Sequence, residues 1–264
     1  MQIISIINQK GGVGKTTTVI NLAAGLAQQE KKILVIDLDP QGNATTGLGL
    51  SNVENSSETI YGVLNGTKTI SDVIKKTEFK NLDIVTSNVD LSGLEVETAG
   101  DSQRAFILKT KLTSYLNDSE ALYDYILIDC PPSLSLLTVM ALVSSHSLVV
   151  PLQTEFFALE GLTQLIKTIE RIKVNLNPKL EIRGILLTMY DKRNKLSSQV
   201  EKEARDYFNE KVYVTVIPRN VRLSEAPSHG MPVLIYDRAC LGSKSYFNFT
   251  DEFISQEEKI GSAA

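Results

Sequence analysis

The sequence predicts an α/β fold, in which a doubly wound, mostly parallel β-sheet is flanked by helices. Two observations support this prediction. Seven short apolar, largely β-branched runs recur along the 264-residue chain, and most are continuous, as in strands buried on both faces of a parallel sheet. Segments with helical spacing of apolar residues lie between these runs, so strands and helices alternate as in βαβ units.

The elements are expected in order along the chain. Strands are expected at 3–7, 33–37, 82–86, 125–129, 147–152, 183–189 and 212–218. A glycine-rich loop follows the first strand and leads into a helix of about 14 residues, with one apolar stripe. Further helices are expected at 103–116, 134–143, 158–175, 195–209 and 244–258. Neither an internal repeat nor a flexible linker is visible, so we expect one domain over 1–255 and a flexible tail over 256–264.

Composition indicates a soluble globular protein. Hydrophobic residues make up 42% and charged residues 22%, which is too apolar for a disordered chain. No apolar run approaches the roughly 18 residues that span a bilayer, and the first residues lack the basic segment and cleavage site of a signal peptide. Cys130 and Cys240 form no metal-spaced pair, so a reduced, cytoplasmic chain is predicted.

Residues 8–17, NQKGGVGKTT, approximate a phosphate-binding loop. In the pattern G-x-x-x-x-G-K-[ST] the end fits at Lys15 and Thr16, but Gln9 stands where the first glycine should be. The two adjacent glycines of the loop can still let backbone N–H groups turn toward an anion, at the positive end of the following helix. Lys15 would then reach the β- and γ-phosphates, and the Thr16 hydroxyl would bind Mg²⁺. The alternative is a tight strand–helix turn without a ligand.

Three aspartates follow apolar strands. Asp37 and Asp39 end the run ILVID and begin the next loop, and Asp129 follows YILI and precedes two prolines. Ligands of open α/β sheets bind at the carboxyl ends of strands, and an aspartate held there acts on Mg²⁺, usually through water. Each aspartate could instead cap the next helix, but together with the loop the metal-site interpretation is favoured.

The chain resembles the ParA/Soj family of partitioning ATPases, which belong to the deviant-Walker-A group of P-loop proteins. The motifs that carry the resemblance are KGGVGKTT, DLDPQGNAT, YILIDCPPSLSLLT, FFALEGL, LLTMYD and VIPRNVRLSEAPSHGMP, which occur in this order between residue 2 and about residue 255. The resemblance implies an ATPase that uses ATP and Mg²⁺.

The resemblance also implies roles for the loop residues. In the family, the lysine at the position of Lys10 reaches across an ATP-sandwiched homodimer to the phosphates of the other subunit, much as an arginine finger does in trans. Lys15 matches the phosphate-binding lysine and Thr16 the Mg²⁺ ligand. Thr17 lies by the α-phosphate.

Further roles fall outside the loop. Asp39 matches the aspartate that orients the attacking water, Asp37 supports the metal, and Asp129 matches the Walker-B aspartate. Pro218 and Arg219 lie in the segment that frames the adenine. The implied nucleotide-binding residues are Lys10, Gly11, Gly12, Val13, Gly14, Lys15, Thr16, Thr17, Pro218 and Arg219. The implied catalytic residues are Lys10, Lys15 and Asp39, and the metal-site residues are Thr16, Asp37 and Asp129.

Basic residues gather in the C-terminal part of the chain. Between residues 183 and 244, eleven Lys and Arg face seven Asp and Glu, a balance of +4 in a chain whose net charge is −4. In similar ATPases, arginines of this region form a nonspecific DNA-binding surface when two subunits pair, which implies this role for Arg193, Arg219 and Arg222. A patch summed over two chains suits a salt-sensitive phosphate contact. Each arginine could equally be a solvated surface charge.

The resemblance thus implies an ATP-dependent DNA-partitioning ATPase. ATP–Mg²⁺ would drive homodimerisation and nonspecific DNA binding. Slow hydrolysis, stimulated by a ParB-type centromere-binding partner, would then release the DNA. The protein would be cytoplasmic, and associated with the nucleoid when ATP is bound. The alternative is a MinD-like positioning ATPase that switches a protein or membrane cargo. No membrane partner is expected, because acidic residues outnumber basic ones over 243–259, whereas a membrane-binding relative should end in a basic amphipathic helix.

Overall fold

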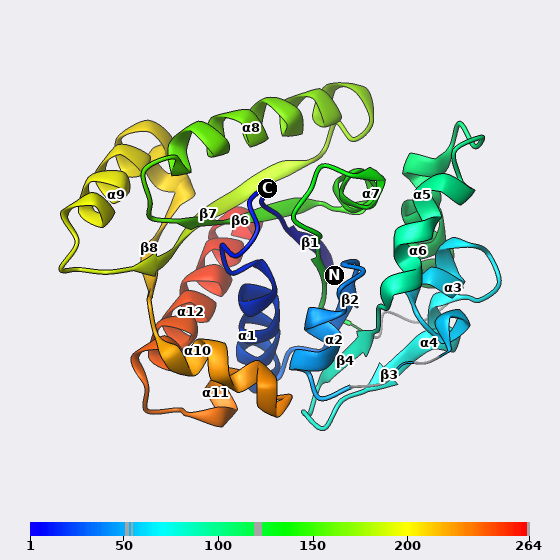
Figure 1. The fold of residues 1–264 in the computed structure, drawn as a ribbon, viewed down its shortest axis with the longest axis horizontal. Coiled ribbons are helices and arrows are strands. Elements are labelled where there is room, and N and C mark those ends of the chain that lie inside the picture. The colour runs from blue at the N-terminus through cyan, green and yellow to red at the C-terminus, as the bar shows by residue number, and fades with distance from the viewer. Residues whose placement is uncertain (51–52, 54, 119–122, 263–264) are drawn as a thin grey trace.

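The computed structural model describes residues 1–50, 53, 55–118 and 123–262. Within them, one eight-stranded sheet has the order β3-β4-β2-β5-β1-β6-β7-β8 (Figure 1). The strands are β1 (Gln2–Ile6), β2 (Ile33–Asp37), β3 (Ile74–Lys76), β4 (Leu82–Val85), β5 (Tyr125–Asp129), β6 (Ser147–Gln153), β7 (Glu181–Tyr190) and β8 (Val212–Pro218). Every neighbouring pair is parallel except β3 and β4. The predicted doubly wound, mostly parallel sheet is therefore confirmed.

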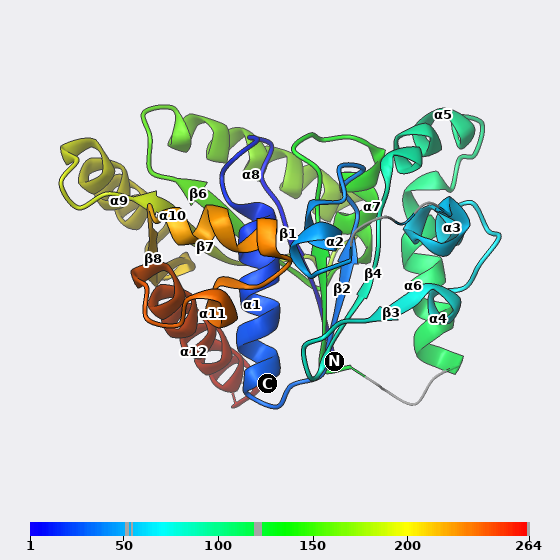
Figure 2. The same cartoon turned by 60° about the horizontal axis from the view of Figure 1, so that its bottom comes forward.

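Helices cover both faces of this sheet (Figure 2). They are α1 (Lys15–Gln28), α2 (Asn43–Gly47), α3 (Ile60–Leu64), α4 (Ile70–Val73), α5 (Leu94–Glu97), α6 (Ile107–Asp118), α7 (Leu136–Ser144), α8 (Ala158–Asn175), α9 (Lys195–Phe208), α10 (Val221–Glu225), α11 (Val233–Tyr236) and α12 (Leu241–Ser262). All six predicted helices are confirmed, as α1, α6, α7, α8, α9 and α12. The helix expected from residue 103 begins later, because Arg104–Phe106 forms a 3₁₀ turn. At the C-terminus α12 continues to Ser262, into the segment expected to be a flexible tail.

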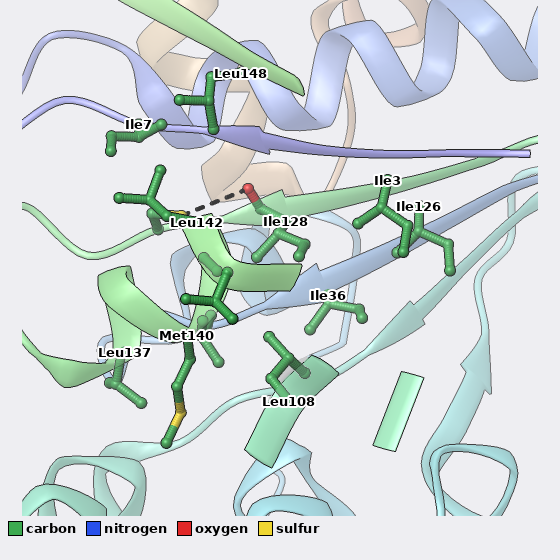
Figure 3. Packing of buried hydrophobic residues seen from close by; sticks show 14 of the residues in the cluster. Ile3, Ile7, Ile36, Leu108, Ile126, Ile128, Leu137, Met140, Leu142 and Leu148 are labelled. Carbon is green, nitrogen blue, oxygen red and sulfur yellow. Dashed lines mark hydrogen bonds between the residues drawn. The ribbon is translucent and has the colours of Figure 1, made fainter. Parts of the chain in front are cut away.

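Alternation along the central strands explains why their apolar runs are continuous. In β5, Ile126 and Ile128 face one hydrophobic cluster, whereas Tyr125 and Leu127 face the other. The first cluster lies under α6, α7 and α8, and Figure 3 shows Ile126 and Ile128 there with Met140 of α7. The second lies under α1 and α12. A strand covered on both faces needs apolar residues at every position.

The strand order brings the ends of three central strands together. β5 lies between β2 and β1, and its last residue, Asp129, pairs in register with Asp37 of β2 and with Ile6 of β1. The loop that follows β1 therefore leaves the sheet beside both aspartates.

Within the described residues, no helix is long and apolar enough to cross a membrane.

Candidate nucleotide-binding site

The loop between β1 and α1 has the backbone of an anion-binding turn. Gly12 and Gly14 have φ values of 74° and 90°, in the left-handed region that favours glycine. At Gly12 a Cβ would meet no atom within 4 Å, so the backbone angle, rather than lack of space, calls for glycine. Gly14 caps α1 without a side-chain hydrogen bond to the helix. The first N–H groups of α1 thus have no side-chain cap and carry the positive end of the helix dipole.

The two lysines of this loop lie in different surroundings. Lys15 is buried, with 6% of its surface exposed, and its Nζ donates a hydrogen bond to the backbone carbonyl of Lys10 at 3.2 Å. The side chain of Lys10 is 51% exposed and forms an ion pair with Glu155, two residues after β6. One loop therefore presents one cation inward and another at the surface.

The structure brings the three aspartates together at the ends of β2 and β5. Asp37, Asp39 and Asp129 are at most 5% exposed. The Oδ2 atom of Asp37 accepts hydrogen bonds from the amide and the hydroxyl of Thr45, at 2.8 and 2.7 Å. Its Oδ1 accepts from the Asp39 amide at 3.2 Å, and Asp39 Oδ1 accepts from the Gln41 amide at 3.0 Å. These bonds hold the carboxylates of Asp37 and Asp39 in place.

Asp129 differs from the other two. Both of its carboxylate oxygens are buried, and neither has a hydrogen-bond partner of normal geometry among the described residues. The Thr16 hydroxyl lies near enough to favour the charged form, but it does not satisfy this carboxylate. A buried carboxylate without partners is costly unless a cation or ordered water occupies the site with it.

The pKa values of the buried charged groups at these strand ends are shifted in directions that would favour a bound cation. Burial raises the pKa of Asp37 to about 6, although the hydrogen bonds from Thr45 oppose the shift. Burial, and next the Asp37 carboxylate, raise the pKa of Asp129 well above its usual range. Burial lowers the pKa of Lys15, against the attraction of Asp129. One partly desolvated lysine does not balance these carboxylates.

The donor set fits Mg²⁺ rather than a metal held by the protein alone. Among the described residues, no group of three or more His, Cys, Asp or Glu side chains could hold a metal ion. Mg²⁺ commonly keeps several waters and is bound by one or two protein oxygens together with phosphates. The Thr16 hydroxyl and the orphaned carboxylate of Asp129 are donors of this kind.

A separate pocket of about 250 Å³ opens beside the loop. Thr17 of α1 lines one part of it, and Pro218 and Arg219 at the end of β8 line another. The amide of Arg219 donates to the Tyr190 carbonyl at 3.1 Å, which holds this segment against β7. Complete small-molecule sites are usually about 300–1,000 Å³, so this pocket suits one part of a ligand.

The three predicted DNA-contacting arginines lie at or beyond the carboxyl ends of β7 and β8. Arg193 is 90% exposed and forms two hydrogen bonds, of 3.1 and 3.0 Å, with Asp191. This contact lowers the pKa of Asp191 to about 2. Arg222 pairs with Glu225 at 2.7 Å and with Asp237 at 3.4 Å. Arg219 is exposed beside the pocket. Two of the three arginines thus already have carboxylate partners.

Three side chains to which the motifs gave no role contact the loop or hold it in place. The Thr188 hydroxyl of β7 donates to the Val13 carbonyl at 2.8 Å. Asn8 is buried and donates from Nδ2 to the Pro151 carbonyl at 2.7 Å. Glu155 is the partner of Lys10. The position of Asn8 directly after an apolar strand could have marked it as a candidate. Its hydrogen-bond partner could not be predicted, because Pro151 lies on β6, far away in the sequence.

Comparisons with known proteins agree with this geometry. A family model described as an AAA domain matches residues 1–182. The chromosome partitioning protein ParA of Caulobacter vibrioides is 51% identical over 257 residues, which cover 97% of this chain and 95% of that protein. The chromosome-partitioning ATPase Soj of Treponema pallidum is 47% identical over 251 residues, which cover 95% of this chain and 96% of that protein. A structure from Mycobacterium smegmatis, named cobyrinic acid a,c-diamide synthase with bound ATP analog and magnesium, is 33% identical with a TM-score of 0.83, covering 95% and 93%.

These matches extend over almost the whole chain, and the site at the strand ends has the loop and the aspartates that the motifs predicted. The family indicated by the sequence is confirmed: this protein belongs to the ParA/Soj family of chromosome-partitioning ATPases.

Proposed function

We propose that the protein is an ATP-driven switch for DNA partitioning. It binds ATP with Mg²⁺ and pairs with a second copy around the nucleotides, and the pair binds DNA without sequence preference. Hydrolysis, slow alone and stimulated by a ParB-type centromere-binding partner, releases the DNA. Residues 1–255 act as one ATPase domain. The observation that carries the proposal is the placement of two lysines in one loop, with Lys15 buried and Lys10 at the surface.

The loop would hold the phosphates of ATP. Backbone N–H groups from Gly11 to Thr17 surround the anion, and the start of α1 adds its positive dipole end. Lys15 turns from the Lys10 carbonyl to the β- and γ-phosphates. The base would lie in the 250 Å³ pocket, between Thr17 and the segment of Pro218 and Arg219.

The three aspartates would have different roles around the γ-phosphate. Bound Mg²⁺ would neutralise charge that develops on the phosphate oxygens. Thr16 would supply a direct oxygen ligand for this ion, and Asp37 and Asp129 would support the metal site as nearby carboxylates. Asp39 orients the attacking water, because the Gln41 amide holds its Oδ1 and leaves its other oxygen for that contact.

Lys10 would act on the nucleotide of the second copy. Its ammonium is half exposed, whereas the buried Lys15 occupies the inner side of the same loop. A cation placed from outside against the γ-phosphoryl group stabilises the transition state as an arginine finger does. ATP binding and pairing would then depend on each other.

DNA binding would depend on pairing, because a single copy exposes too few unpaired arginines to hold DNA strongly. The chain is acidic overall, with a net charge of −4. Two copies double the number of exposed arginines on one surface, and phosphates must compete with Asp191 for Arg193 and with Glu225 for Arg222. Such a contact is salt-sensitive. The paired state would associate with the nucleoid.

A DNA-retention assay with ATP, with ADP and without nucleotide, at low and at moderate salt, tests this proposal. We expect retention with ATP only, and a steep loss as salt increases. Equal retention with ADP would contradict a nucleotide-controlled switch. Absence of retention in every state would favour the MinD-like alternative, in which the cargo is a protein or a membrane.

A further inference from the structure

We propose that Glu155 is a positioning residue for Lys10: its carboxylate holds the lysine in the unpaired subunit and must release it when two copies pair. The inference rests on the proposed function, in which Lys10 reaches the nucleotide of a second copy. It adds a restraint on that step, and the restraint comes from the segment between β6 and α8.

The sheet itself brings the two residues together. β1 and β6 are hydrogen-bonded parallel neighbours, so the loop after β1 and the segment after β6 leave the sheet at the same edge. The Lys10 amide donates to Asn8 Oδ1 at 3.0 Å, and Asn8 Nδ2 donates to the carbonyl of Pro151, within β6, at 2.7 Å. The backbone of Lys10 is thereby tied to the strand that leads to Glu155.

The backbone of Glu155 is also held. Its amide donates to the Gln153 carbonyl at 2.9 Å, and its carbonyl accepts from the Ala158 amide at 3.0 Å. The side chains are 29% exposed for Glu155 and 51% exposed for Lys10. Because both backbones are fixed and both side chains reach solvent, Lys10 can leave Glu155 by side-chain rotation alone.

The strength of the contact suits a step that must reverse in each cycle. An exposed ion pair is weak and is screened by salt, whereas a phosphate oxygen offers a stronger charge-assisted bond to an ammonium. Phosphate can therefore displace Glu155, and each dimer breaks two such pairs. When the phosphate leaves, Glu155 can take Lys10 back, which favours separation of the copies.

The test is Glu155→Gln, which keeps the size of the side chain and removes its charge. With a non-hydrolysable ATP analogue, we expect the dimer dissociation constant at low salt to fall about twofold to tenfold. This difference should shrink at high salt, a dependence that a packing role would not show. Glu155→Asp, which keeps the charge, should stay near wild type. Glu160→Gln, the same charge change on the exposed first turn of α8, is the matched control and should have no effect.

Two comparisons separate the restraint from the underlying function. If Glu155→Gln dimerises no more tightly than Glu160→Gln while Lys10→Ala fails to dimerise, the restraint is wrong and the proposed function stands. If Lys10→Ala dimerises like wild type, both are wrong. Circular dichroism of each variant checks that it is folded.

Discussion

The side-chain ammonium of Lys15 donates a hydrogen bond to the backbone carbonyl of Lys10, with 3.2 Å between Nζ and O. The side chain of Lys15 is thus directed inside the loop, while the Lys10 side chain extends to Glu155. The two lysines are five residues apart and can be tested separately, since one should serve binding and the other pairing.

Lys15→Ala should weaken binding of ATP with Mg²⁺ by about 10-fold to 100-fold, because a charge-assisted bond to phosphate is lost. Lys10→Ala should bind ATP within about twofold of wild type as a monomer but should not dimerise, since only the contact to the other copy is missing. Calorimetry measures the first effect and light scattering the second. Normal ATP affinity in Lys15→Ala, or normal dimerisation in Lys10→Ala, would reassign that lysine.

Asp39→Ala should still bind ATP and dimerise, but its turnover should fall by roughly 100-fold or more, because positioning of the attacking water is lost while the phosphate loop is intact. Phosphate release measures the rate, and light scattering confirms pairing. Asn43→Ala, an exposed change in the adjacent α2, serves as a control. Wild-type turnover in Asp39→Ala would show that another group orients the water.

Asp129→Asn should raise the thermal stability of the nucleotide-free protein while it weakens the effect of Mg²⁺. Among the residues that the structure describes, this buried carboxylate has no hydrogen-bond partner of normal geometry. Its neutral replacement should therefore stabilise the fold by about 1–3 kcal/mol, or several degrees in Tm. The gain should increase with pH, since only the charged form is penalised.

The matched control is Asp83→Asn. Asp83 is also buried, but it accepts hydrogen bonds from Lys76 and Tyr123, each at 2.6 Å. This variant should lose stability. Calorimetric melts of both variants at several pH values provide the measurement, and equal destabilisation would contradict the orphaned state of Asp129.

The pH dependence of stability should carry the signature of Asp37. Its pKa is raised from 3.8 to about 6, so in that range the folded state retains a proton that the unfolded chain has released. The stabilisation is fully present below the unfolded value and is lost as the pH rises through about 6, on the order of 2–3 kcal/mol. Urea unfolding at several pH values measures this slope. In Asp37→Asn the slope near pH 6 should decrease, and an unchanged slope would assign the proton to another group.

Arg193→Ala combined with Arg222→Ala should reduce ATP-dependent DNA retention at low salt by about 10-fold or more, because each pair of copies loses four phosphate contacts. Lys167→Ala with Arg171→Ala removes the same charge from the exposed side of α8 and should have little effect. Unchanged retention in the first variant would show that the DNA surface lies elsewhere.

Local sequence patterns alone predicted most of the strands and the main residues of the candidate site. Continuous apolar runs identified seven of the eight described strands, and GKTT with the aspartates at strand ends indicated the phosphate loop and its metal site. The three-residue β3 and the short helices such as α2 were missed, because so few residues show no period.

Only the tertiary structure decided which distant residues meet. It placed Asp129 between β2 and β1, joined Thr188 to Val13, and set Glu155 against Lys10. It also decided that Lys15 is buried and Lys10 exposed, since the sequence pattern does not show which of the two side chains is accessible to solvent. Strand order and burial depend on packing across the whole sheet, and a pattern within a few residues does not contain that information.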